Sequence, residues 1–166
     1  MSPSLEDLLA RADARGLAAA ALACLDRCLP LLDPPGEDVL HPLWCGLAEE
    51  GTDWAGRLAG ARAALEPGGG PVPEEAGQVR RMLAGAPSSW DAAALRGWAE
   101  ECSRTALDLH ERLGGQALLS GERRRQARVL DLLADGAPGG LRPVRDVSAQ
   151  GRRVLLAVVS RRARGA

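Results

Sequence analysis

Four side chains in the first third of the chain have the chemistry of metal ligands. Cys24 and Cys28 are one helical turn apart, as are His41 and Cys45 if that segment is helical. Two such pairs could supply the tetrahedral thiolate and imidazole set that zinc or cuprous ions prefer. The sequence lacks a Cys-x-x-Cys knuckle, and Cys24 and Cys28 share their predicted helix face with leucines. The alternative is that these thiols simply pack in the core.

Cys45 is also a candidate for a reactive thiol, independently of any metal site. It stands between Trp44 and Gly46, near the predicted N-terminus of a helix, where the helix dipole lowers the pKa of a thiol. It is therefore a candidate for a reactive or redox-sensing thiol, and the alternative is a small residue packed beside Trp44. His110, on the edge of a predicted core stripe, is expected to be structural.

The densest basic cluster consists of Arg123, Arg124, Arg125 and Arg128. Guanidinium groups bind phosphate bidentately, so this cluster could hold a nucleic acid or another anionic ligand. No aromatic residue follows Trp98, so this part of the chain cannot stack on bases.

Charge is unevenly distributed along the sequence. Residues 121–166 carry 11 arginines against 4 acidic residues, a net charge of +7, whereas residues 1–120 carry 10 arginines against 18 acidic residues, a net charge of −8. This asymmetry suits an anionic partner, or a basic end that packs on the acidic part of the same molecule.

Tryptophan is the only aromatic residue type present. Trp44, Trp90 and Trp98 are candidate anchors for a protein partner, because exposed tryptophan is typical of binding hot spots. Trp90 follows a serine-containing turn at a predicted helix start, where partial exposure is expected. The other role of such residues is to anchor a core.

Several classes of enzyme site are absent from the sequence. Lys, Tyr, Phe, Ile and Asn do not occur, a bias that suggests a GC-rich bacterial genome. Without lysine there is no Schiff-base or phosphate-loop lysine. Neither Gly-x-Ser-x-Gly nor His-Glu-x-x-His occurs, and the glycine run 68–70 lies between prolines rather than between a strand and a helix. We therefore expect no cofactor and a non-enzymatic protein.

Leucine and alanine recur every third or fourth residue almost throughout, which predicts an all-α bundle or stacked helical hairpins of about six or seven helices. The Pro/Gly-rich segment 67–73 is predicted to join two helical halves, 4–66 and 74–164, of a single domain spanning 1–166. Periodicity alone leaves residues 154–159 open as helix or strand.

The N-terminal residues do not resemble a secretory signal, and no apolar run approaches the length of a membrane span. These features predict a soluble, cytoplasmic protein without membrane contacts, whose cysteines are free thiols. The function expected is that of a helical protein-interaction or regulatory protein, which binds another protein or itself. The alternatives are a binder of an anionic ligand or nucleic acid through the basic C-terminal third, and a thiol-based metal or redox protein.

Overall fold

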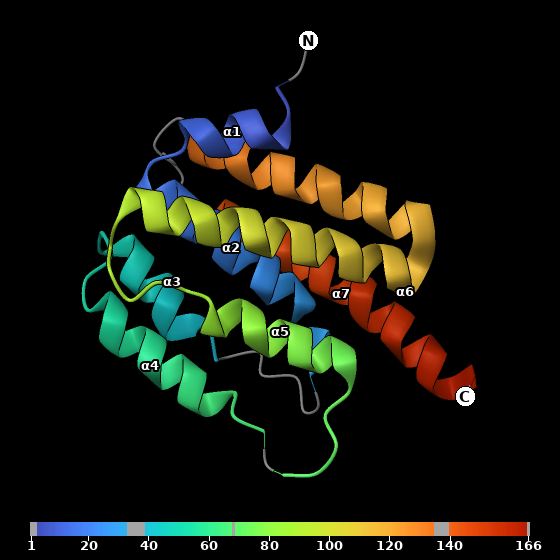
Figure 1. Ribbon diagram of the computed structural model, residues 1–166. Helices are drawn as coiled ribbons and strands as arrows, with labels where there is room; N and C mark the ends of the chain where they lie inside the picture. The colour runs from blue at the N-terminus through green and yellow to red at the C-terminus, as the bar shows by residue number, and fades with distance from the viewer. Residues whose placement is uncertain (1–2, 33–38, 68, 135–139, 166) are drawn as a thin grey trace.

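The computed structural model describes residues 3–32, 39–67, 69–134 and 140–165. The prediction of an all-α bundle is confirmed, because these residues form helices and no strand. The elements in chain order are α1 (Leu5–Arg11), α2 (Ala14–Cys28), the 3-10 turn η1 (Leu29–Leu31), α3 (His41–Ala48), α4 (Trp54–Ala64), α5 (Glu74–Ala84), α6 (Ala92–Ala134) and α7 (Arg142–Gly165). Figure 1 shows their arrangement.

The element α6 is a hairpin of two helical limbs. Gly115, with φ 66° and ψ −154°, interrupts the helix, and the chain reverses there. The first limb, residues 92–114, and the second limb, residues 116–134, then lie side by side in Figure 1. Glycine adopts this positive φ without steric cost, which is why the first limb ends at the pair Gly114 and Gly115.

Helix α2 is the central helix of the bundle. Its residues from Gly16 to Cys28 are all buried, as expected for a helix that is apolar on almost every side. It packs against both α6 and α7, and α3 and α5 also contact it. The charged residues of α2 therefore have to find their partners inside the protein.

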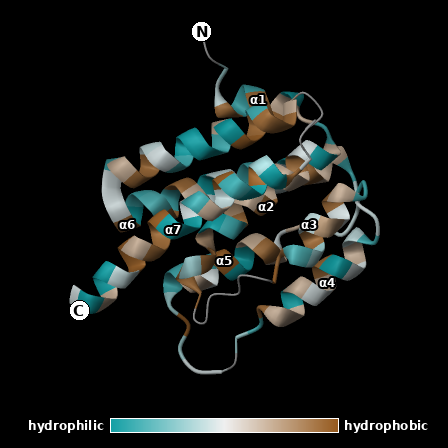
Figure 2. Cartoon of the chain, turned by 180° about the vertical axis from the view of Figure 1, so that it is seen from behind, coloured by the Kyte–Doolittle hydropathy of each residue, from teal (hydrophilic) through white to brown (hydrophobic). Residues whose placement is uncertain are grey.

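Helix α7 begins at Arg142, with Pro143 in its first turn, where proline fits a helix well. Residues 154–159 are helical, which decides between the two alternatives left open by the sequence. The buried residues recur every third or fourth position, at Val144, Ser148, Gly151, Leu155 and Val158. Figure 2 shows the matching alternation of hydrophilic and hydrophobic residues along α7.

One hydrophobic core includes residues from both sides of the segment 67–73, of which Gly68 lies outside the described residues. Leu25 and Leu43 from the first side belong to the same buried cluster as Leu95 and Leu109 from the second. Of the helices described, none combines the length and the apolar run that a bilayer crossing needs.

Candidate functional site: a groove on the α6 hairpin

Helix α1 lies on the α6 hairpin as a short, separately capped element (Figure 1). The Ser4 hydroxyl accepts a hydrogen bond from the Asp7 backbone N–H at 3.1 Å, and the Asp7 carboxylate accepts one from the Ser4 N–H at 3.3 Å. This capping box begins the helix. α1 ends at Arg11, and Asp13 then caps α2 by accepting a hydrogen bond from the Gly16 N–H at 2.8 Å.

A hollow of about 670 Å³ lies beside α1, and we call it the α6 groove. Its lining comes from α1 and from both limbs of α6, namely Ser4, Leu5, Glu6, Leu9, Glu100, Ser103, Arg104, Leu107 and Arg123. Leucines form its apolar part, and carboxylates and guanidinium groups form its charged part. The volume is in the range of sites that hold a small molecule or the side chains of a bound helix.

A second hollow, of about 270 Å³, borders α1 through Leu8 and lies against Leu130 and Leu133 of the second limb. Between the two hollows, Leu9 of α1 is buried, whereas Leu5 and Leu8 are half-buried. Helix α1 has 7 residues, and Leu9 is the one leucine of it that is fully buried.

The floor beneath α1 is closely packed and partly polar. A void of only about 10 Å³ remains there, and Ser103 and Gln126 lie on it together with Leu5 and Leu9. The Ser103 hydroxyl donates a hydrogen bond to Oε1 of Gln126 at 2.5 Å, which joins the two limbs of α6. Nε2 of Gln126 donates in turn to the Glu122 carboxylate at 3.0 Å.

Glu122 forms an ion pair with Arg27 at the centre of the protein. Nε and Nη2 of Arg27 donate to the two carboxylate oxygens at 2.7 and 2.8 Å, and both side chains are 0% exposed. Burial alone raises the pKa of Glu122, but the charge and hydrogen bonds of Arg27 outweigh it and hold the pKa below its usual value. Such a bidentate pair holds the second limb of α6 against α2.

His110 faces the same carboxylate from the first limb. Its Nε2 lies 3.6 Å from Oε1 of Glu122, and its Nδ1 lies 2.7 Å from the carbonyl oxygen of Ala106. A carbonyl oxygen only accepts, so Nδ1 carries the proton in this contact. Burial lowers the pKa of His110 more than the neighbouring Glu122 raises it, which favours a neutral ring.

A second internal ion pair joins α2 to α7. Asp26, 3% exposed, accepts a hydrogen bond from Nη1 of Arg152. Burial raises the pKa of Asp26, and Arg152 opposes this rise. Consecutive residues of α2 thus hold two different helices, Arg27 through Glu122 of α6 and Asp26 through Arg152 of α7.

The predicted metal ligands fall into two separate pairs. Cys24 and Cys28 are buried on α2, with Cys24 next to the Arg27 guanidinium. His41 and Cys45 lie on the outer side of α3, where Nε2 and Sγ are 3.4 Å apart. Within the described ranges, no three His, Cys, Asp or Glu side chains form a group that could hold a metal ion.

The four predicted anion-binding arginines point in different directions. Arg123 lines the α6 groove, and the aliphatic part of Arg125 lies against Gly151 of α7. Arg124 and Arg128 are exposed. Burial lowers the pKa of Arg125, and the positive charges of Arg27 and Arg124 add to this effect. The cluster in the sequence is therefore divided between two faces of the second limb.

The predicted partner-binding tryptophans lie mostly inside the protein. Trp44 and Trp98 are 3% and 4% exposed, and Trp90 is half-buried. The Arg145 guanidinium lies over the Trp44 ring, with its carbon 5.8 Å from the ring centroid. Trp54 stacks edge-on against both Trp90 and Trp98, at centroid distances of 5.4 and 6.0 Å. Of the three candidates, only Trp90 keeps a substantial accessible surface.

The groove and its polar floor were not predicted. The uninterrupted apolar stretch before Asp26 and Arg27 was the available signal for the ion pairs, because charges on a fully buried helix require internal partners. The glycine pair at 114–115 was the signal for the groove, since two amphipathic helices joined by a tight turn pack side by side.

The sequence matches no protein-family model, and no curated protein or solved structure is significantly similar to the chain.

Proposed function

We propose that this chain is a non-enzymatic interaction or regulatory protein that binds a helix of another protein in the α6 groove. The observation that carries the proposal is the 670 Å³ hollow, which has leucines on its inner side and charged residues on its rim. Grooves of this composition bind amphipathic helices, whose apolar side chains enter the hollow while their polar side chains remain at the rim.

The leucine that α6 itself contributes to the groove is Leu107. This half-buried leucine lies one turn after Ser103 on the first limb, and the rim beside it carries Arg104 and Arg123. Arg104 is held by Glu101 in an exposed ion pair, whereas Arg123 has no ion-pair partner among the described residues. A helix bound here would place apolar side chains on Leu107 and polar ones near Arg123.

The test is site-specific photo-crosslinking in the native cell, with the full-length protein. A photoreactive amino acid at position 104 is expected to give one dominant adduct, whose linked peptide is an amphipathic helix of the partner. The control position is Ala59, an exposed residue of α4 far from the groove lining. Adding Leu107→Glu should abolish the adduct at position 104 and leave the thermal unfolding temperature within a few degrees.

Three results would contradict the proposal. The adducts at positions 104 and 59 could be the same, the Leu107→Glu variant could keep the adduct, or the purified partner could fail to bind the purified protein. Robust turnover of a small substrate by the purified chain would also end a non-enzymatic assignment.

A second candidate function is binding of an anionic ligand or nucleic acid through the basic C-terminal third. It is favoured by the exposure of Arg124 and Arg128, neither of which is paired with an acid in the part of the chain that the structure describes. Affinity for a DNA duplex should then fall steeply as salt rises, and Arg124→Ala with Arg128→Ala should flatten that dependence. Absence of duplex binding at low salt would remove this candidate.

A further inference from the structure

We infer that α1 occupies the place of the partner helix, and that the partner carries the pattern of α1: leucines at positions i, i+3 and i+4 with acidic residues between them. This inference rests on the proposed function, because it names the ligand of the same groove. The juxtaposition that carries it is a short leucine helix, with one fully buried leucine, that forms one wall of a 670 Å³ hollow on the α6 hairpin and leaves that hollow unfilled.

The leucines of α1 face the hollows on the hairpin. Leu5 and Leu9 line the α6 groove, and Leu8 lines the smaller hollow on the other side. The sequence Leu5-Glu6-Asp7-Leu8-Leu9 therefore places all of its apolar side chains on α6, as a bound amphipathic helix does.

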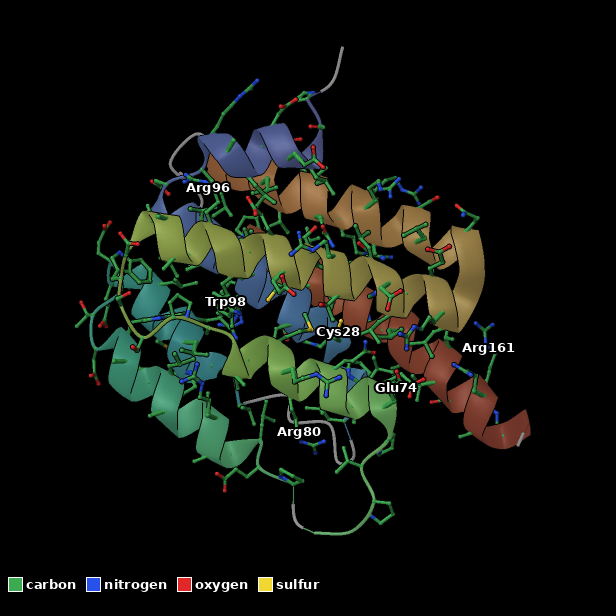
Figure 3. All side chains as sticks on the ribbon, viewed as in Figure 1. Cys28, Glu74, Arg80, Arg96, Trp98 and Arg161 are labelled. Atoms are coloured by element: carbon green, nitrogen blue, oxygen red, sulfur yellow. The ribbon has the colours of Figure 1, made fainter. Side chains whose placement is uncertain are left out.

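Few polar contacts hold α1 in place. Arg96 of the first limb reaches its C-terminal end, where Nε is 3.5 Å from the Leu9 carbonyl oxygen and Nη2 is 3.4 Å from that of Ala12 (Figure 3). Both distances are at the long limit for a hydrogen bond. No ion pair involves α1 in the ranges that the structure describes.

Undocking of α1 would also leave the N-terminal cap of α2 intact. Asp13 supplies the cap of α2 from outside α1, so the start of α2 is satisfied whether or not α1 is docked. The Ser4 and Asp7 capping box lies within α1 and its own N-cap, so it likewise does not depend on the groove.

The charged lining of the groove bears on what a partner helix could place opposite Arg123. Glu6 of α1 and Glu100 of the first limb line the same hollow as Arg104 and Arg123, and of these four only Arg104 is in an ion pair among the described residues, with Glu101. The hollow also passes Ser4, the N-cap of α1, and includes Leu107. A helix of the same pattern with further turns at its N-terminal end could cover Leu107 and bring a carboxylate to Arg123, which α1 does not do.

The direct test uses a synthetic peptide of residues 3–13, acetylated and labelled with a fluorescent dye, and the full-length protein. Binding is measured by fluorescence anisotropy. The variant Leu9→Asp should undock α1 and bind the peptide about tenfold more tightly than the wild type, or better. In the wild type, a docked α1 lowers the fraction of molecules whose α6 surface is free to bind the peptide. Ala10→Asp, at an exposed position of the same helix, is the matched control and should bind like the wild type.

Hydrogen exchange on the wild-type protein gives a second measurement that needs no variant. Saturating peptide should speed amide exchange in residues 5–11 and leave it unchanged in the two limbs of α6, which the peptide covers as α1 does. Exchange in the protein is followed in fragments that extend beyond residue 13, which the peptide cannot produce.

The inference is overturned if the peptide binds neither the wild type nor Leu9→Asp, if Ala10→Asp gains as much affinity as Leu9→Asp, or if α1 stays protected while the peptide is bound. These results differ from failure of the proposed function. A crosslinked partner helix at position 104 with α1 still protected would keep the groove as an interaction site and reject only the exchange. Displacement of α1 by the peptide without any crosslinked partner would keep the exchange and reject the groove as a site for a partner protein.

Discussion

Gly151 of α7 lies directly against the side chain of Arg27 on α2. A Cβ atom at position 151 would be 2.5 Å from Cδ and 2.9 Å from Cγ of Arg27, and 3.2 Å from Cδ of Arg125. Arg27 cannot simply move aside, because its Nε and Nη2 are both engaged by Glu122. The close approach of α7 to α2 therefore depends on glycine at this position.

We expect Gly151→Ala to lower the free energy of unfolding by about 1–3 kcal/mol, the usual cost of an overpacked core. The matched control is Gly97→Ala in α6, where no atom lies within 4 Å of the added methyl group. That variant should gain about 0.5–1 kcal/mol, because alanine favours a helix more than glycine does. Urea unfolding of both variants is the measurement, and equal effects would refute the steric account.

The Arg27–Glu122 pair should behave as a coupled unit. Because each single replacement, Arg27→Met or Glu122→Leu, leaves a buried charge without its partner, each should cost about 3–5 kcal/mol of unfolding free energy. The double variant should cost clearly less than the sum of the two. Arg112→Met, which removes an exposed arginine paired with Asp108 and Glu74, should cost at most about 1 kcal/mol. Additive losses in the double-mutant cycle would show that the two side chains are not coupled.

Acid should destabilise the fold in two stages, the first through His110. Its pKa in the folded protein lies below the usual 6.5, so between these two values only the unfolded chain binds the proton. The free energy of unfolding therefore decreases as pH falls from about 6.5 towards the lowered pKa. The pKa of Glu122 is also lowered, so its contribution is lost at more acid pH, below its usual value of 4.5.

Urea unfolding at several pH values separates the two stages. The variant His110→Gln should be flatter than the wild type between about pH 7 and 5, while the decline at lower pH should remain. Asp26, whose pKa is raised by burial, has the opposite sign and weakens this lower stage. An unchanged slope between pH 7 and 5 in the variant would exclude His110 as the source.

The four thiols should differ sharply in reactivity. Burial raises the pKa of Cys24 to about 12 and also raises the pKa values of Cys28 and Cys102 well above normal. Cys45 is only half-buried, next to His41. A thiol reagent should therefore modify one cysteine per chain quickly under native conditions, and the others only after unfolding. Cys45→Ala should remove the fast phase, and its persistence would place the reactive thiol elsewhere.

Local patterns in the sequence predicted most of the fold. The spacing of leucine and alanine that predicts the helices acts within a few residues, so it can be read from the sequence. The buried residues of the first limb of α6, among them Leu95, Trp98 and Cys102, have the same spacing of three or four residues.

The candidate site depends on partners that are distant in the sequence. Arg27 and Glu122 are 95 residues apart, and nothing near either residue specifies the other. The placement of α1 on the hairpin is equally a result of tertiary packing. For the same reason, the four arginines of the second limb look like one cluster in the sequence but face in different directions on a helix.

The two adjacent charged residues of α2, Asp26 and Arg27, also constrain the rotation of this helix and its position along its axis. A rotation of α2 about its axis, or a shift by one turn, would detach Asp26 from α7 and Arg27 from α6 at the same moment, and would leave four ionised groups without counterparts. Leucine and alanine are interchangeable enough to tolerate several ways of stacking helices. We expect the Asp-Arg dipeptide of α2 to favour one of those stackings in this protein.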